Sequence, residues 1–209
     1  MKQILFDLDG TLTDSGQGIM NCAELTFAHY DLEIPTRQQM RSIIGPPLKD
    51  SFLRFGIPAS ELDNAVEFYR KHYIAKGQFE NFPYPGIQQL LEKLRLDGHK
   101  LYVATSKPEE MAINILKYFG LYPYFHIICG AVSDAKRNTK EDVIEHLLTL
   151  LDNRENLVMV GDTIFDVKGA AYHGIPTVAV TWGYGVVQDM AAAGATIVNT
   201  MDELYEALQ

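Results

Sequence analysis

The sequence predicts an α/β protein: a three-layer Rossmann-like core with a parallel sheet, and a small all-helical cap inserted after the first strand. The apolar run Ile-Leu-Phe at residues 4–6 is typical of a buried parallel strand. From residue 86 onward, apolar runs alternate with helical patterns, which favours a parallel sheet. Residues 15–84 show helical spacing and no evident strand. The predicted domains are therefore a core of residues 1–14 plus 85–209 and a cap of residues 15–84.

The core strands and helices follow one another along the chain. Strands are expected at residues 100–105, 126–129, 156–161, 176–180 and 196–198, and helices at 140–151, 165–173 and 202–208. A further helix is expected after residue 107. Pro108 suits its first turn, Glu109 and Glu110 favour its N-terminus, and Gly120 suits its end.

The cap pattern is helical throughout. Apolar residues from Ile19 to Tyr30 recur on one face of a first helix. Thr36 with Gln39 makes a capping box at the start of a second helix, which residues 45–47 (Gly-Pro-Pro) end. Two more helices are expected at 48–55 and 62–73. Residues 83–86 (Pro-Tyr-Pro-Gly) are expected to form the hinge back to the core.

Composition excludes several classes of protein. The chain has 209 residues, of which 47% are hydrophobic, so it can bury a sizeable core. A net charge of −9 disfavours nucleic-acid binding. Cys22 and Cys129 are isolated, which suggests a reducing compartment. Without a signal peptide or an 18-residue apolar run, we expect a cytoplasmic protein with no membrane association. No heptad pattern indicates an oligomeric state.

Two carboxylates stand where the first strand ends. Asp7 and Asp9 are two residues apart, so alternation points both toward one spot, and Gly10 permits a sharp exit from the strand. An isolated Asp-x-Asp is usually a solvated turn. Here the strand context favours a ligand site, because ligands in α/β sheets bind at the carboxyl ends of strands.

Three more polar segments would meet at the same edge of the sheet. They are residues 105–108 (Thr-Ser-Lys-Pro), Lys140 at a helix start, and residues 161–166 with Asp162 and Asp166. Each has an ordinary interpretation as a helix cap, a surface lysine or acids placed at a helix N-terminus. Their convergence argues for a site with up to four carboxylates. Such a site needs a hard divalent cation such as Mg²⁺ before it can accept a phosphate.

These segments together resemble those of the haloacid dehalogenase-like hydrolases, and in particular the phosphoglycolate-phosphatase-like branch with a helical cap. The resemblance spans the chain. Its first motif is residues 7–14 (Asp-Leu-Asp-Gly-Thr-Leu-Thr-Asp), its second Thr105, its third Lys140 and its fourth residues 161–166. Gly183 also fits the branch. Lys136 is a second lysine near the third motif, but Lys140 is preferred because it begins a helix.

The resemblance implies a role for each residue. Asp7 would be the nucleophile that forms an aspartyl-phosphate, and Asp9 the general acid and base. Mg²⁺ would be held by Asp7, the backbone carbonyl of Asp9 and Asp162, while Asp166 would bind it or orient Lys140. The phosphoryl oxygens would be bound by three groups, namely the Thr105 side chain, the Ser106 N–H and Lys140. The cap would close over the site.

The resemblance implies a phosphatase acting on a small phosphorylated metabolite, and alternatives on the same scaffold stay open. They are a phosphosugar mutase, a 5′-nucleotidase, a pyrophosphatase and a phospho-aspartate regulatory protein. A dehalogenase is disfavoured, because Asp9 and the fourth motif would have no task in it. The cap would select the substrate, and its candidate residues are Gly45, Pro46, Arg41 and Lys49, although charged helix residues are usually solvated.

Overall fold

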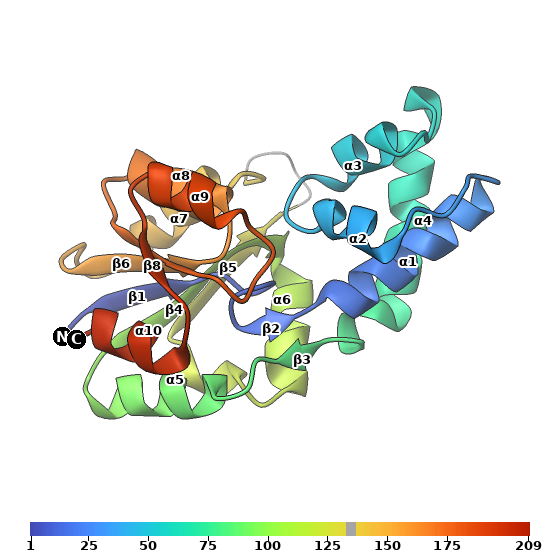
Figure 1. Cartoon of the computed structure of the whole chain (residues 1–209). Helices are drawn as coiled ribbons and strands as arrows, with labels where there is room; N and C mark the ends of the chain where they lie inside the picture. Colours follow the sequence, from blue (N-terminus) through green and yellow to red (C-terminus); the bar gives the residue numbers. More distant parts are fainter. Residues whose placement is uncertain (133–136) are drawn as a thin grey trace. The chain divides into compact units, whose positions relative to one another are not determined.

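The chain divides into two compact units (Figure 1). In this computed structural model, which describes residues 1–132 and 137–209, the first unit contains residues 1–14 and 83–209 and the second contains residues 15–82. Each unit has its own buried core. Among the described residues, no helix combines the length and the apolar character needed to span a bilayer.

The first unit contains a six-stranded sheet in the order β5-β4-β1-β6-β7-β8, and every neighbouring pair is parallel. All four residues of β1 are buried, as expected for a strand covered on both faces. The strands are β1 (Gln3–Phe6), β4 (Lys100–Pro108), β5 (Ile127–Ala131), β6 (Leu157–Gly161), β7 (Thr177–Val180) and β8 (Thr196–Val198).

Helices cover both faces of this sheet, as Figure 1 shows. Ile4 and Phe6 of β1 pack into one core cluster with α5 (Ile87–Leu96), α6 (Glu109–Tyr118) and α10 (Met201–Ala207). Leu5 points the other way and packs with α7 (Lys140–Thr149) and α8 (Ile164–Tyr172). The predicted three-layer, Rossmann-like fold class is therefore confirmed.

Three details of the first unit differ from the sequence prediction. β4 continues to Pro108 and pairs there with Ala131 after a shift in register, so α6 begins only at Glu109. A proline pushes the residue before it toward extended conformations, which prevents a helix from starting at residues 106–107. The short strands β2 (Thr13–Asp14) and β3 (Phe82–Pro83) pair where the chain passes between the units. Helices α5 and α9 (Val187–Ala192) were also not predicted.

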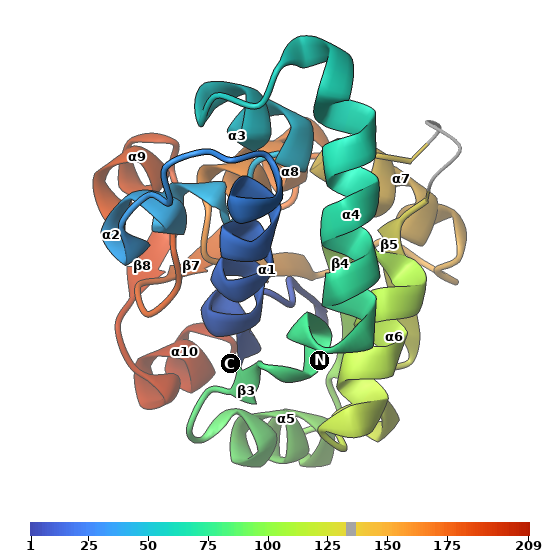
Figure 2. The ribbon, with the colours of Figure 1, turned by 90° about the vertical axis from the view of Figure 1, so that its right-hand side faces the viewer.

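The second unit is helical. Its four α-helices are α1 (Gly16–His29), α2 (Arg37–Met40), α3 (Leu48–Arg54) and α4 (Leu62–Ala75). Helices α1 and α4 pack side by side (Figure 2). The capping box of Thr36 and Gln39 is present at the start of α2. Short 3₁₀ turns link these helices at η1 (Arg41–Ile43) and η2 (Ala59–Glu61), and a third, η3 (Gly77–Phe79), follows α4. A fourth, η4 (Tyr122–Tyr124), lies in the first unit.

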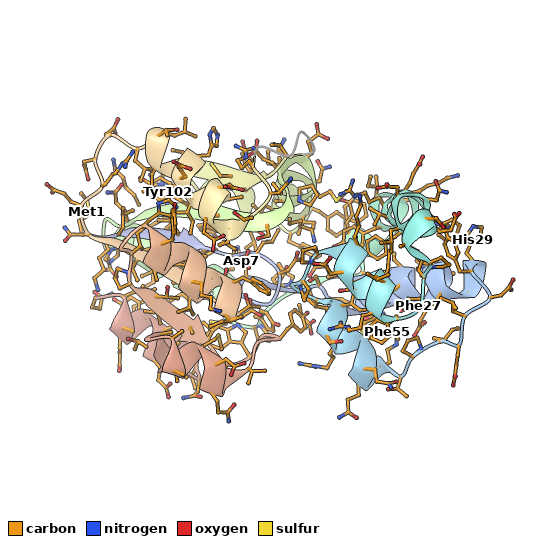
Figure 3. The ribbon with its side chains drawn as sticks, turned by 90° about the horizontal axis from the view of Figure 1, so that it is seen from above. Met1, Asp7, Phe27, His29, Phe55 and Tyr102 are labelled. Carbon is orange, nitrogen blue, oxygen red and sulfur yellow. The ribbon has the colours of Figure 1, made fainter. Side chains whose placement is uncertain are left out.

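Aromatic side chains form the core of the second unit. The ring centroids of Phe27 and Phe52 lie 5.9 Å apart, and those of Phe52 and Tyr69 lie 5.8 Å apart, both in edge-on contacts. Phe27 also contacts Phe55 at 5.6 Å (Figure 3). Phe52, Tyr69 and Tyr73 are buried, so they are core residues of this unit.

Candidate active site

The first strand delivers Asp7 to the carboxyl end of the sheet (Figure 3). The Asp7 N–H donates to the carbonyl of Val160 on β6 at 2.9 Å, which fixes the backbone just beyond β1. The carboxylate is buried, and its Oδ1 accepts from the Leu8 N–H at 2.8 Å and from Lys140 Nζ at 2.9 Å. The Thr105 hydroxyl also bonds to it. Asp7 is therefore held in one orientation.

Lys140 is the first residue of α7, and its ammonium group is surrounded by protein oxygens. Nζ lies 2.9 Å from the Ala104 carbonyl, 2.9 Å from Asp7 Oδ1 and 2.7 Å from Asp166 Oδ1. Its stem packs on Gly169, where a Cβ would lie only 2.6 Å from Lys140 Cγ. The buried lysine thus joins the end of β1 to the start of α8.

Asp162 follows β6 and is fully buried. Its Oδ1 accepts from the Thr11 hydroxyl at 3.1 Å, and its Oδ2 accepts from the Tyr184 N–H at 2.8 Å. Gly10 and Gly183 pack directly against the carboxylate, and a Cβ at either residue would lie 2.2 Å from Oδ2. Gly10 also has a φ of +85°, which L side chains rarely adopt. Both glycines are therefore required by the place of Asp162.

Asp166 lies in the first turn of α8 and has two separate tasks. Its Oδ2 accepts from the N–H and the hydroxyl of Thr163, at 3.0 and 2.8 Å, and so completes a capping box. Its Oδ1 faces Lys140. Gly161 leaves room for it, since a Cβ there would lie 2.3 Å from Asp166 Cγ.

Three carboxylates meet at this edge of the sheet. Asp7, Asp162 and Asp166 each offer one oxygen, and these oxygens all lie within 4.8 Å of one another. The cluster contains no histidine or cysteine, so its donor set fits a hard cation such as Mg²⁺ and not a softer metal. Among the described residues, Asp9 adds no side-chain oxygen to this cluster.

Burial and crowding set the charge states of the cluster. Burial, together with the nearby charge of Asp166, raises the pKa of Asp7 to about 6 against the opposing effect of Lys140. Burial and the charges of Asp166 and Asp7 also raise the pKa of Asp162. Burial lowers the pKa of Lys140, but the two carboxylates beside it outweigh this and raise it, so the lysine stays protonated. A cation would relieve the repulsion among the acids.

The sequence profile of the haloacid dehalogenase-like hydrolases matches residues 4–180, a range that contains every residue of this cluster. The chain belongs to this family. Its third-motif lysine is taken to be Lys140, which contacts Asp7. The alternative, Lys136, lies outside the described residues.

Curated members and solved structures resemble this hydrolase along most of its length. The tyrosine-protein kinase PtkA of Mycobacterium tuberculosis is 43% identical over 98% of this chain and 72% of its own length. A 5′-nucleotidase of Pseudomonas aeruginosa is 37% identical over 90% and 86%, and a phosphoglycolate phosphatase of Aquifex aeolicus 34% identical over 88% and 86%. A predicted phosphatase of Clostridium acetobutylicum superposes with a TM-score of 0.92 at 39% identity, over 99% and 97% of the chains.

The second motif of this hydrolase differs from the sequence prediction. Thr105 is buried beside Asp7, as expected. Ser106, however, is exposed within β4, so the predicted strand end at Thr105 is wrong: the strand continues to Pro108, and α6 begins at Glu109 with Glu109 and Glu110 in its first turn, as expected. Glu109 Oε2 accepts from the Gly130 N–H at 3.1 Å, so a carboxylate occupies that region. An anion bound by the Ser106 N–H would therefore contact the backbone of an extended strand and not a helix N-terminus.

Sequence reasoning missed Lys107. Its side chain is only 5% exposed, and its Nζ lies 2.7 Å from Asp9 Oδ2. The available signal was the spacing: Thr105 and Lys107 are two residues apart, so an extended chain points both toward the same face. The expectation of a helix start at this point concealed that signal.

The loop after β7 contributes two residues, Trp182 and Tyr184, that the sequence analysis did not identify when it singled out Gly183. Trp182 Nε1 donates to the Thr11 carbonyl at 3.2 Å. The Tyr184 hydroxyl donates to Asp14 Oδ1 at 2.5 Å, while its own N–H binds Asp162. Burial and this contact with Asp14 raise the pKa of Tyr184. The loop thus supports the first and fourth motifs together.

The candidate specificity residues all lie in the second unit. Arg41 is exposed in η1, and Gly45 has a φ of +105°. Lys49 is exposed and forms an ion pair with Asp63 at 2.5 Å, while Pro46 is half-buried. Lys49 is therefore partly neutralised within its own unit.

Proposed function

We propose that this chain is a Mg²⁺-dependent phosphatase that hydrolyses a small-molecule phosphomonoester through an aspartyl-phosphate on Asp7. The observation that supports it best is the arrangement around Asp7. A buried carboxylate is fixed by Leu8, Lys140 and Thr105 next to two further carboxylates that can hold a cation. Phosphoryl transfer depends mainly on positioning and on charge stabilisation, and this site offers both.

In the first step the Asp7 carboxylate attacks phosphorus. A bond forms between Asp7 oxygen and phosphorus, the bond to the leaving oxygen breaks, and Asp9 gives that oxygen a proton. In the second step Asp9 takes a proton from water as the water attacks the phosphorus. Phosphate leaves and Asp7 is regenerated. Lys140 and the Thr105 hydroxyl lie against Asp7, where they can stabilise the transferring oxygens. The backbone N–H of Ser106 is a third candidate donor.

The metal would be held by Asp7, Asp162 and the backbone carbonyl of Asp9, with Asp166 as a further ligand or as the partner that orients Lys140. When bound, Mg²⁺ supplies positive charge where the phosphoryl oxygens accumulate negative charge. The three clustered carboxylates and Lys140 leave two negative charges in excess when all are ionised. One divalent cation would neutralise them and let a phosphate approach.

The substrate class is proposed from the relatives. Proteins similar to this chain are named phosphoglycolate phosphatase, 5′-nucleotidase and pyrophosphatase. We therefore expect a small phosphorylated metabolite, handled by a protein of the cytoplasm, where its two free, buried cysteines would stay reduced. Phosphate release from phosphoglycolate, a nucleoside monophosphate, a phosphosugar and pyrophosphate would identify the class, and assay for isomer formation would detect a mutase.

Transfer to a tyrosine hydroxyl is a second candidate, favoured by the 43% identity to PtkA. The same Asp7 would accept the terminal phosphoryl group of ATP, with release of ADP, and pass it to the tyrosine oxygen, with Asp9 taking the hydroxyl proton and Asp7 being regenerated. Incubation with labelled ATP and a tyrosine-containing peptide separates the two functions. A phosphatase releases free phosphate, whereas a transferase labels the peptide.

The proposed function is tested with p-nitrophenyl phosphate. We expect turnover with Mg²⁺, loss of turnover on addition of EDTA, and at least a ~10³-fold loss in the variant Asp7→Asn, because the nucleophile is removed. Asp202→Asn, on the exposed start of α10, is the control and should retain full activity. Wild-type turnover that survives in Asp7→Asn would rule out the mechanism.

A further inference from the structure

The ion pair between Lys107 and Asp9 has no task in the mechanism above. Lys107 Nζ and Asp9 Oδ2 lie 2.7 Å apart, and the two side chains are 5% and 19% exposed. A surface ion pair is often an accident of two long side chains, whereas this one is largely withdrawn from water. It also fixes the residue that would exchange protons with the substrate.

The two oxygens of Asp9 have different surroundings. Oδ2 is held by Lys107. Oδ1 is buried and has no hydrogen-bond partner among the residues that the structure describes. A buried carboxylate oxygen without a partner is unfavourable, so such an atom is typically kept for a ligand or a reacting group. One oxygen of Asp9 is therefore anchored, and the other is available.

Lys107 is itself held in place by its strand. Its N–H donates to Thr105 Oγ1 at 3.3 Å, which ties it to the residue that contacts Asp7. On its other side Gly130 of β5 lies so close that a Cβ there would be 2.6 Å from the Lys107 carbonyl oxygen. A single segment of β4 thus places Thr105 at the nucleophile and Lys107 at the acid–base residue.

We infer that Lys107 is a positioning residue: by holding Asp9 Oδ2 it directs Asp9 Oδ1 toward the leaving-group oxygen and, later, toward the hydrolytic water. The inference rests on the proposed phosphatase function. It differs from a role in binding phosphate, because a positioning residue acts only through Asp9. Its loss should therefore affect only those substrates that need a proton from Asp9.

Two esters of similar size separate these roles. p-Nitrophenolate leaves without a proton, whereas the alkoxide from benzyl phosphate requires one. The ratio kcat/KM reports the steps up to leaving-group release, so it isolates the first proton transfer. In Lys107→Met we expect kcat/KM to fall by about 30- to 100-fold for benzyl phosphate, within the range of general acid catalysis. For p-nitrophenyl phosphate the loss should stay below about threefold.

Controls distinguish positioning from folding. Lys168→Met removes an exposed lysine of α8 and should change neither ester. Lys107→Arg keeps a cation near Asp9 and should restore part of the benzyl phosphate activity. If Lys107→Met does not fold, as judged by circular dichroism and Tm, Lys107→Gln keeps a hydrogen-bond donor and is measured in its place, with the same ester preference expected.

The decisive comparison uses Asp9. In the background of Asp9→Asn, adding Lys107→Met should cost no further activity on benzyl phosphate, because the residue through which it acts is already disabled. A further loss in that background, or an equal loss on both esters in the single variant, would overturn the inference and make Lys107 a phosphate ligand. A wild-type protein inactive on both esters would instead remove the proposed function, and this inference with it.

Discussion

At the scale of single residues, close contacts fix the Asp162 carboxylate in the candidate site. Asp162 accepts two hydrogen bonds and is pressed by two glycines, so its carboxylate has one available position. Gly183 is the more informative of the two glycines, because no positive φ complicates its replacement. The three atoms nearest to a Cβ at this position all belong to Asp162, the proposed metal ligand.

Gly183→Ala should therefore weaken Mg²⁺ binding by about tenfold or more, since the new Cβ would lie 2.2 Å from Asp162 Oδ2 and displace it. Isothermal titration calorimetry or the Mg²⁺ dependence of Tm measures this. Gly194→Ala is the matched control. Its φ is +92° and its Cβ would meet nothing within 4 Å, so it should lower Tm without changing the Mg²⁺ affinity. Equal affinities in both variants would contradict the assignment of Asp162.

The raised pKa of Asp7 gives a pH prediction. Because the pKa rises from 3.8 to about 6 on folding, the folded metal-free protein binds an extra proton between these values. The contribution of Asp7 to stability should thus fall as pH rises from 4 to 6 and stay constant above, and Asp7→Asn should lack this fall. Bound Mg²⁺ needs the ionised form, so its stabilisation should be larger at pH 7 than at pH 5. The same rise in Tm at both values would argue against Asp7 as a ligand.

At the scale of elements, two helix starts show how a cap places a candidate site residue. The Thr139 hydroxyl accepts from the Asp142 N–H at 3.2 Å at the start of α7, one residue before Lys140. The Thr200 hydroxyl accepts from the Glu203 N–H at 3.1 Å at the start of α10, which lies outside the site. The two caps are alike in geometry and differ in what they position.

Replacing either threonine by alanine should cost about 1 kcal/mol of unfolding free energy, because both remove an N-cap. Only Thr139→Ala should also lower kcat, by about three- to tenfold, since the turn that carries Lys140 loosens. Urea unfolding and p-nitrophenyl phosphate turnover measure the two effects. A similar fall of kcat in Thr200→Ala would show that general stability, and not the place of Lys140, determines the rate.

The strand β4 shows where sequence reasoning reached its limit. Residues 105–108 resemble a helix start, with hydroxyls, a proline and two following glutamates, and local pattern alone favours that interpretation. The segment is instead a strand, because it pairs with β5 as far as Pro108, which lies opposite Ala131. Such pairing joins residues distant in sequence, so only the structure shows that residues 105–108 are extended and that the spacing of Thr105 and Lys107 is the spacing of a strand.

At the scale of the whole molecule, the fold class was predictable because strand and helix patterns alternate strongly after residue 86 and because residues 4–6 of β1 form an apolar run. Asp7, Asp162 and Lys140 were also predictable, since they stand at strand ends and a helix start. The contacts of Trp182 and Tyr184 were not, because they depend on how a loop between β7 and α9 folds back. Loops carry little periodic signal.

The two units have separate cores, so damage to one should stay local. Phe52 is fully buried among Phe27 and Tyr69 in the second unit, and Phe52→Ala should cost that unit about 3 kcal/mol or more. Hydrogen exchange should accelerate in α1, α3 and α4 and stay unchanged in β1, β4 and β6. Faster exchange throughout the sheet as well would mean that the two units unfold as one.

The central claim is that Asp7 carries the phosphoryl group, and chemical trapping tests it most directly. The protein is mixed with excess p-nitrophenyl phosphate and Mg²⁺, quenched in acid during turnover and reduced with borohydride, which converts an aspartyl-phosphate to homoserine. Peptide mass spectrometry then locates the modified residue. We predict homoserine at position 7 and none in Asp7→Asn. Phosphate release with an unmodified Asp7, or with the label on another residue, would contradict the account.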